Sequence, residues 1–392
     1  MKSSKTPILD FLTEYAASDT TRLHMPGHKG IAPACVPAAL SNMYRFDITE
    51  IAGADNLFAP DGIISASEEA ASRIFGAATF YSCEGSSLAI KAMLYLALKH
   101  FEGAADKSPS FKPALIALGK NHKALYHGAE LLNLSVERAD PVKEDIVSKI
   151  KELKAGGYTV VGVYATYPDY FGSVTDLKAI KEAILPFDIP LLVDGAHAAY
   201  FKFLKGEFAK DYPHPIDCGA DMVCASAHKT LPALTGAAYL HISDSLEDII
   251  PLAKHAMDLF GSSSPSYLIM ASLDGVNGAA KEFEERLESF CLKVKKLKEE
   301  LADMGFNIAV SDPMRITVRK SERFNGSDFA NALREHSCEP ECFADGYVIL
   351  MLSPYNTDKD LKKIKEAFES LHEGGITKAP QIKSYDCLEN FS

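Results

Sequence analysis

The chain has 392 residues, enough for two or more domains, and its 47% hydrophobic and 24% charged residues are typical of a globular protein. Its formal net charge of −12 argues against nucleic acid as a partner, because phosphate binding requires a basic surface. No apolar run reaches the ~18 residues that a membrane span needs, and the first residues lack the apolar core of a signal peptide. We therefore expect a cytoplasmic protein with no membrane contact.

The N-terminal part is predicted to be helical at two places. Residues 7–22 have the apolar spacing of an amphipathic helix. The loop 23–30 that follows contains Pro, Gly, two His and a Lys, so it is either a surface turn or a segment that lies over an active site. Further on, Ser65 and Glu68 form a capping box that predicts a helix running to about Phe75.

A Gly/Ser turn at Gly85, Ser86 and Ser87 precedes a strongly helical stretch from Leu88 to about His100. Such a turn can offer backbone N–H groups and hydroxyls to a phosphate, assisted by the helix dipole. Many helices begin with Ser for capping alone, so a phosphate site here needs support from elsewhere in the chain.

Alternating strands and helices follow. Apolar runs predict buried strands at 113–119 and 159–166, and a helix is predicted from Asp176 to Ala183. Strand, helix and strand in succession imply parallel pairing with right-handed crossovers. The stretch 236–242 extends the same sheet, so the sequence predicts an α/β fold with a mostly parallel central sheet.

The last third of the chain changes character. A long amphipathic helix at 276–304 leads into short strands at 307–310, 315–318 and 348–352 and helices near 326–335 and 358–372. We therefore predict three parts: an N-terminal helix and loop (1–45), a large domain (46–275) and a smaller α+β domain (276–392).

Two apolar runs end abruptly in polar residues. The run 221–225 is followed by Ser226, His228 and Lys229, at the carboxyl edge of the sheet where open α/β folds bind ligands. A lysine is more often a surface residue, but a partly desolvated amine loses its proton easily and can form a Schiff base with an aldehyde. The run 190–193 ends in Asp194, a carboxylate able to hold the protonated ring nitrogen of pyridoxal 5′-phosphate.

Other candidate groups are weaker on their own. His122, after the strand 113–119, could stack on the cofactor ring, although a lone His is more often satisfied in the core or exposed. The spacing between Cys338 and Cys342 suits zinc poorly and no second pair accompanies it, so we expect no metal.

Four segments resemble one family. The segments at 24–30 (HMPGHKG), 47–50 (DITE), 226–235 (SAHKTLPALT) and 264–267 (SPSY) are similar to the bacterial ornithine/lysine/arginine decarboxylases of the aspartate-aminotransferase fold. The resemblance runs from about residue 20 to residue 370, with the motifs in the right order. It implies a pyridoxal-phosphate (PLP)-dependent enzyme of fold type I.

The resemblance also implies roles for single residues around the cofactor ring. Lys229 would be the Schiff-base lysine, and Asp194 would pair with the pyridinium nitrogen. His122 would stack on the ring, and His197 would lie near its phenolic oxygen. The residues implied at the phosphate are Gly85, Ser86, Ser87, Ser226 and His228.

The resemblance further implies a homodimer with shared active sites, in which the turn 264–266 approaches the site of the partner subunit. The implied reaction is decarboxylation of arginine, lysine or ornithine to a polyamine or its precursor, with His122 or Lys229 protonating the product. Two departures concern the substrate: Gly236 follows Thr235 where the family often has Gln, and the chain ends soon after the point where longer members continue into a C-terminal domain.

Alternatives remain open. Aminotransferases of this fold usually bind the substrate carboxylate with an arginine, for which Arg315 is a candidate, although a solvent-exposed charge on a strand accounts for it equally well. A shortened relative with a binding or regulatory role is a second alternative. Glu341 and Asp345 could receive the distal cation of a basic substrate, and surface charge is the simpler interpretation of both.

Overall fold

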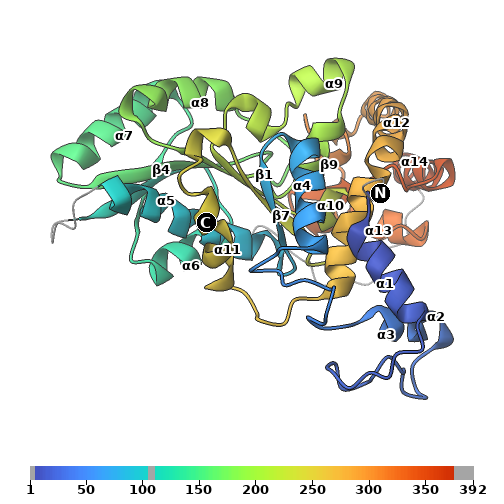
Figure 1. Cartoon of the computed structure of the whole chain (residues 1–392). Coiled ribbons are helices and arrows are strands. Elements are labelled where there is room, and N and C mark those ends of the chain that lie inside the picture. The colour runs from blue at the N-terminus through green and yellow to red at the C-terminus, as the bar shows by residue number, and fades with distance from the viewer. Residues whose placement is uncertain (1–4, 105–110, 375–392) are drawn as a thin grey trace. The chain divides into compact units, whose positions relative to one another are not determined.

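The computed structural model describes residues 5–104 and 111–374 and divides into two compact units (Figure 1). The larger unit comprises the chain up to Tyr167, Asp176–Lys202 and His214–Ala280; the smaller comprises Pro168–Thr175, Phe203–Pro213 and the chain from Lys281 onward. In the described residues, no helix combines the length and the apolar character that crossing a bilayer requires.

A seven-stranded sheet forms the centre of the larger unit, in the order β1-β7-β6-β5-β4-β2-β3. Strands β3, β2, β4, β5 and β6 pair in parallel, whereas β7 runs antiparallel to both β6 and β1. The predicted α/β fold with a mostly parallel sheet is therefore confirmed. The strands are β1 (Ala78–Ser82), β2 (Pro113–Leu118), β3 (Ser135–Ala139), β4 (Thr159–Thr166), β5 (Leu191–Asp194), β6 (Met222–Ala225) and β7 (Ala238–Ile242).

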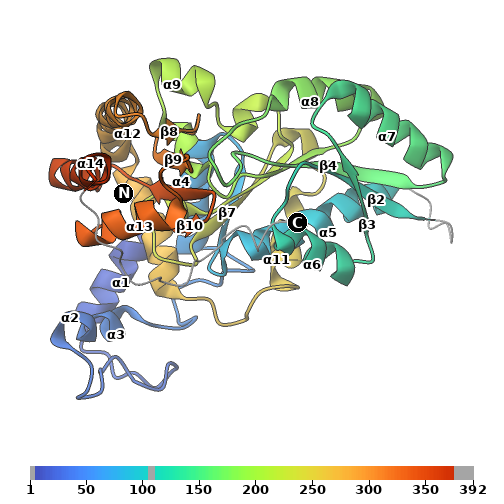
Figure 2. The same ribbon diagram turned by 180° about the vertical axis from the view of Figure 1, so that it is seen from behind.

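The central strands are buried along nearly their whole length, which explains their continuous apolar sequences. Every residue of β5 and β6 is buried, as expected for parallel strands covered on both faces. Helix α5 contributes a large part of the core that packs on the sheet. Figures 1 and 2 show helices on both sides of the sheet. The α-helices of this unit are α1 (Pro7–Ala17), α2 (Ala38–Ser41), α3 (Met43–Phe46), α4 (Ile63–Phe75), α5 (Gly85–Ala104), α6 (Lys123–Leu131), α7 (Lys143–Ala155), α8 (Leu177–Ile184), α10 (Ala227–Thr230) and α11 (Ala253–Asp258), with 3₁₀ turns at Leu185–Phe187, Ala199–Phe203, Pro215–Cys218, Asp244–Leu246 and Ile250–Leu252.

The start of helix α4 and the end of helix α1 differ from the predictions. Helix α4 begins at Ile63, so the proposed capping box at Ser65 is wrong. The carboxylate of Asp55 caps this helix instead, because its Oδ2 accepts hydrogen bonds from the backbone N–H groups of Gly62 (2.9 Å) and Ile64 (2.9 Å). Helix α1 ends at Ala17 rather than at residue 22.

The smaller unit contains a four-stranded antiparallel sheet in the order β10-β11-β9-β8. The predicted strands and helices of this part are present, and the short strand β10 was not predicted. Helix α12, expected from residue 276, already begins at Tyr267 in the larger unit. The elements are α9 (Gly206–Asp211), α12 (Tyr267–Asp303), α13 (Gly326–Glu335), α14 (Asp358–His372), β8 (Asn307–Ile308), β9 (Arg315–Arg319), β10 (Cys342–Ala344) and β11 (Tyr347–Met351).

Candidate active site

The carboxyl ends of β4, β5 and β6 meet at one edge of the sheet. In the strand registers, Thr166 of β4 lies beside Asp194 of β5, and Asp194 lies beside Cys224 of β6. Polar residues that end neighbouring parallel strands are therefore brought together, as in other open α/β folds. The short helix α10 follows β6 and carries Lys229.

Lys229 and His197 are in direct contact. The Nζ atom of Lys229 lies 3.2 Å from Nε2 of His197, which follows β5 after a tight turn. His197 is buried, whereas Lys229 is exposed in the single chain. A side chain at Gly195 in this turn would come within 2.9 Å of Val223, so the close approach of β5 and β6 favours glycine there.

Asp194 is buried and surrounded by neutral hydrogen-bond donors. Its Oδ1 accepts hydrogen bonds from the backbone N–H of Ala196 (3.1 Å) and from the thiol of Cys224 (3.5 Å). Burial, and then the charge of Asp194, raise the pKa of both Cys224 and the nearby phenol of Tyr164 well above their ordinary values. Both groups therefore stay neutral and keep their protons beside the carboxylate.

His122 is held by the start of helix α6. Its Nδ1 accepts a hydrogen bond from the backbone N–H of Ala124 at 3.2 Å, so the ring caps the helix. Burial lowers the pKa of His122; Asp194 opposes this effect and Lys229 adds to it. The imidazole is therefore neutral near pH 7 and interacts electrostatically with both groups.

Asn121 and Thr166 belong to the same edge and were not identified as site residues from the sequence. The hydroxyl of Thr166 donates to Oδ1 of Asn121 at 3.2 Å, and the amide of Asn121 donates to the carbonyl oxygens of Leu118 and Gly119. These bonds join the ends of β2 and β4. The only sequence signal for this link was the polar side chain of Asn121 directly before His122.

The Gly/Ser turn lies at the first turn of α5. Gly85 has a left-handed backbone (φ +73°), and its N–H donates to the carbonyl of Gly236 at 2.7 Å. The hydroxyl of Ser226 donates to that of Ser86 at 2.8 Å, which joins the end of β6 to the start of α5. Ser87 is exposed on the same first turn. The N-terminal amides of a 20-residue helix and these hydroxyls suit a phosphate.

His228 is oriented by the backbone. Its Nδ1 lies 2.9 Å from the carbonyl of Ala237 and therefore donates to it. Burial lowers the pKa of His228; the carbonyl of Ala237 opposes this and Lys229 adds to it. In the neutral ring Nε2 can only accept, so a phosphate contact at Nε2 would require the protonated form.

The turn 264–266 lies next to the Gly/Ser turn of its own chain. The carbonyl of Ser266 accepts from the thiol of Cys83 at 3.6 Å, and the N–H of Ser262 donates to Glu84 at 2.5 Å. The predicted approach of this turn to a second subunit stays a prediction.

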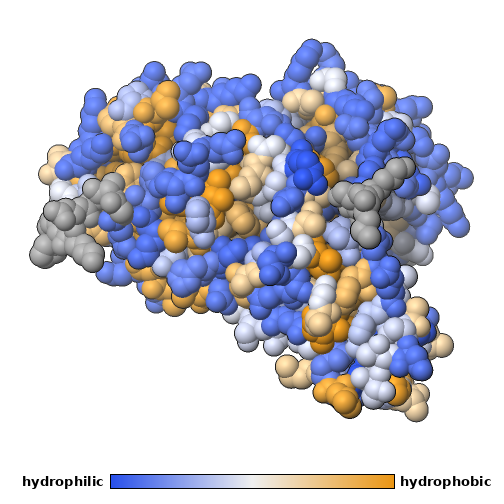
Figure 3. Space-filling model, viewed as in Figure 1, coloured by the Kyte–Doolittle hydropathy of each residue, from blue (hydrophilic) through white to orange (hydrophobic). Residues whose placement is uncertain are grey.

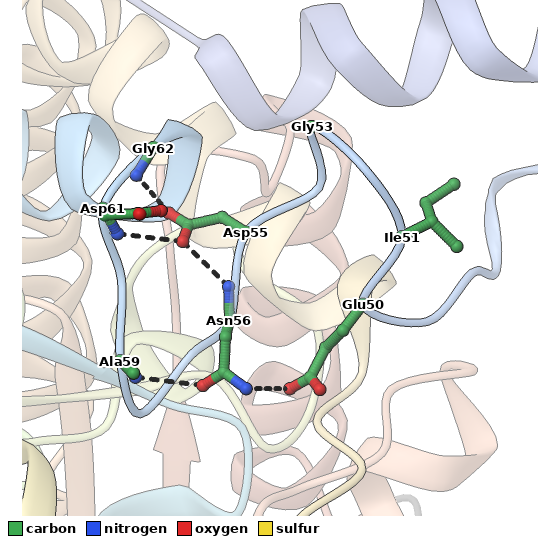
Figure 4. Close-up of a pocket in the computed structure, with 8 residues that line it drawn as sticks. All are labelled: Glu50, Ile51, Gly53, Asp55, Asn56, Ala59, Asp61 and Gly62. Carbon is green, nitrogen blue, oxygen red and sulfur yellow. Dashed lines mark hydrogen bonds between the residues drawn. The ribbon is translucent and has the colours of Figure 1, made fainter.

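A separate pocket of about 350 Å³ lies in the loop before α4 (Figure 4). Two of its carboxylates are already engaged: Asp55 accepts from five backbone N–H groups, and Glu50 accepts from the amide of Asn56 at 2.7 Å. Burial raises the pKa of Asp55, but these N–H donors lower it more, so it lies below the ordinary value. These hydrogen bonds therefore stabilise the loop that forms the pocket. The residues that line it are Glu50, Ile51, Gly53, Asp55, Asn56, Ala59, Asp61 and Gly62.

The candidates in the smaller unit all have partners there. Glu341 accepts from the hydroxyl of Tyr170 at 2.8 Å, and Asp345 pairs with Lys320 at 2.9 Å on the surface. Arg315 is buried, with its Nε 3.1 Å from Asp312, so its interpretation as a solvent-exposed charge is wrong. Glu341, Asp345 and Arg315 are thus all engaged with partners within the smaller unit, and none of the three is free to bind the distal cation or the carboxylate of a substrate.

The sheet topology is that of PLP-dependent enzymes of fold type I. The lysine decarboxylase LdcF of Francisella novicida superimposes with a TM-score of 0.75 at 16% identity, covering 94% of this chain and 60% of that protein. An archaeal O-phosphoseryl-tRNA(Sec) selenium transferase gives a TM-score of 0.65 at 15% identity and covers 93% and 89%. At these identities the similarity concerns the fold alone.

The family model described as the Orn/Lys/Arg decarboxylase major domain matches residues 6–103 and 132–328, and the chain belongs to this family. An arginine decarboxylase of Bacillus subtilis is 27% identical over 402 residues, 95% of this chain and 78% of the relative. The uncharacterized protein YaaO of the same organism is 28% identical over 371 residues, 88% and 74%. The chain spans 60% of the length of the lysine decarboxylase structure that it matches.

Proposed function

We propose that the chain binds pyridoxal 5′-phosphate and decarboxylates a basic amino acid, arginine, lysine or ornithine, to the corresponding amine. The observation that carries the proposal is the edge where the amine of Lys229 contacts His197 close to the buried carboxylate of Asp194. Family membership supports the reaction class, and relatives named arginine and lysine decarboxylase support a basic substrate.

The residues at this edge offer suitable partners for three parts of the cofactor: its aldehyde, its ring nitrogen and its phosphate. Lys229 offers an amine for the aldehyde, and Asp194 offers a buried carboxylate for the ring nitrogen. The amides and hydroxyls at Gly85, Ser86 and Ser226 offer donors for the phosphate. When bound, the cofactor supplies an aldehyde that condenses with amines and a protonated ring that accepts electrons from the α-carbon of an amino acid.

The chain's own groups would control protons around the bound substrate. His197 Nε2, at 3.2 Å from Lys229 Nζ, can exchange a proton with this amine. His122 would pack its flat face on the ring, and its protonated form could deliver a proton to the α-carbon once CO₂ has left; Lys229 is the alternative donor. The donors at Ala196 and Cys224 would hold the carboxylate of Asp194 in place.

The remaining parts of the proposal concern the substrate and the assembly. The substrate would be a free amino acid, its product a polyamine or a precursor, and the working form a cytoplasmic homodimer with shared sites. The excess of acidic residues modestly favours a cationic substrate.

Purified chain supplied with cofactor should release CO₂ and the matching amine from at least one of arginine, lysine and ornithine. Lys229→Ala provides the control, because the exposed amine can be removed without opening a cavity. Absence of both products with all three substrates, in a protein that binds the cofactor, would refute the decarboxylase assignment.

A further inference from the structure

The thiol of Cys224 contacts a buried carboxylate at the candidate site. Cys224 is fully buried, and Asp194 is 3% exposed. Apolar residues also occur on the surface of the molecule, as Figure 3 shows, so apolar character alone does not mark a functional position. A polar group inside the core is more informative, because hydrogen bonds must offset the loss of its contacts with water. The hydrogen bonds of Asp194 therefore show how the fold orients this carboxylate.

The thiol and the carboxylate lie on the same face of the sheet. Asp194 and Cys224 are register partners on β5 and β6, and side chains alternate between the two faces of a strand. Cys224 and Met222 both belong to the core that contains α5. Two residues beyond Cys224, Ser226 bonds Ser86 at the start of the same helix. The thiol that contacts Asp194 thus lies on the side of the sheet where we expect the cofactor.

The side chain of Asp194 is held at one of its two oxygens. Within residues 5–104 and 111–374, its Oδ1 accepts from the N–H of Ala196 at 3.1 Å and from the thiol of Cys224 at 3.5 Å. Burial, and then the charge of Asp194, raise the pKa of the nearby phenol of Tyr164, but in the same residues this hydroxyl makes no regular hydrogen bond. Cys224 is therefore the side chain that fixes Oδ1, and Oδ2 is left for a further donor.

The thiol of Cys224 can only donate here. Burial, and then the charge of Asp194, raise its pKa well above the ordinary value, so the S–H group keeps its proton. The backbone reinforces the contact, because the N–H of Gly195 donates to the carbonyl of Cys224 at 2.9 Å. A carboxylate held at one oxygen by two donors does not rotate freely, so its other oxygen keeps a fixed direction.

We infer that Cys224 is a positioning residue, whose thiol holds Oδ1 of Asp194 so that Oδ2 is the oxygen that meets the ring nitrogen of the cofactor. The inference deepens the proposed function and rests on it, because it concerns the same cofactor. Cys224 acts through Asp194 and does not itself touch the ring. A buried cysteine that only filled space would not distinguish a ligand with a ring nitrogen from a ligand without one.

The test therefore compares two ligands that differ at a single ring atom. Pyridoxal 5′-phosphate and its deaza analogue, in which a C–H group replaces the ring nitrogen, are titrated into the cofactor-free full chain, and both Kd values are measured by absorbance. Cys224→Ala should weaken binding of pyridoxal 5′-phosphate roughly threefold to tenfold, the contribution of one hydrogen bond. Binding of the deaza analogue should change by less than about twofold. The difference between the two effects measures the coupling between the thiol and the ring nitrogen.

Two further variants separate the loss of the donor from the loss of packing. Cys224→Val fills the space of the thiol without offering a donor, so it should lose the preference for the ring nitrogen as Cys224→Ala does. Cys218→Ala removes another buried thiol of the larger unit and is the matched control, which should bind both ligands like the parent.

The possible results separate this inference from the proposed function. Equal weakening of both ligands in Cys224→Ala, or a preference for the ring nitrogen in Cys224→Ala or Cys224→Val as large as that of the parent, would overturn the positioning role and leave the cofactor assignment intact. A parent chain that binds neither ligand would refute the proposed function and the inference with it.

Discussion

Replacing Asp274 by Asn should change how the stability of the chain depends on pH. Asp274 lies in the first part of α12 and is fully buried. Its Oδ2 accepts from the backbone N–H of Leu9 at the start of α1 (2.9 Å), and its Oδ1 accepts from the hydroxyl of Ser67 in α4 (2.6 Å). Asp274 thus attaches helix α1 to α4 and α12.

The expected magnitude follows from the pKa of this carboxyl group. Burial raises the pKa of Asp274 from 3.8 to about 6, against the opposing effect of its hydrogen bonds to Ser67 and Leu9. Between these two values the folded chain binds more protons than the unfolded chain, so its stability falls as pH rises through this window. A difference of about two between the pKa values corresponds to a loss of about 3 kcal/mol over the whole window, complete only above pH ~7. Asn does not titrate, so the variant should not show this loss.

Urea unfolding of both proteins at pH 4, 5, 6 and 7 measures the effect, and other titrating groups cancel in the difference between them. Relative to Asp274→Asn, the parent should lose about 2 kcal/mol between pH 4 and 7. Asp303→Asn, an exposed position at the end of the same helix, serves as control and should follow the parent. A constant difference between parent and Asp274→Asn across this range would refute the proposed burial of a titrating carboxyl group.

Substitutions at three further positions test the candidate site. Lys229→Ala should abolish the visible absorbance of lysine-bound cofactor while the chain stays folded, as judged by circular dichroism. Asp194→Asn should lower kcat/KM by roughly 10²-fold, because a neutral amide cannot stabilise the charged ring nitrogen, and steady-state kinetics with the active substrate would detect it. His122→Ala should weaken cofactor binding about threefold to tenfold in a fluorescence titration, whereas His122→Phe should bind normally because its ring can still stack; equal losses in both variants would contradict a stacking role.

The sheet and its reactive edge could be predicted because the signals are local. A parallel strand covered on both faces must be apolar along its length, so the runs before Asp194 and Ser226 could be identified from the sequence alone. The abrupt change to polar residues marks the end of each strand. Pairing in register then brings Asp194 and Cys224 side by side.

Other features depend on residues far apart in the chain and could not be predicted. The start of α4 is set by the carboxylate of Asp55, outside the helix, and not by the local capping box. The thiol of Cys224 was interpreted only as part of an apolar run, because its contact with Asp194 depends on strand pairing. The link between Thr166 and Asn121 likewise joins two strands that are separated by two helices and a third strand in the sequence.

Arg315 shows how burial decides between two interpretations that the sequence leaves open. Its Nη1 donates to the carbonyl oxygens of Asp169 (2.8 Å) and Tyr170 (2.6 Å), and its Nε pairs with Asp312. A substrate carboxylate could reach this guanidinium only by displacing a buried carboxylate and these carbonyls, which would leave polar groups unsatisfied in the smaller unit. Arg315 therefore stabilises the segment Pro168–Thr175, and an aminotransferase would need its carboxylate-binding residue elsewhere. Measuring whether amino acids convert the bound cofactor to its amine form tests this reasoning directly, because only a transaminase accumulates that form.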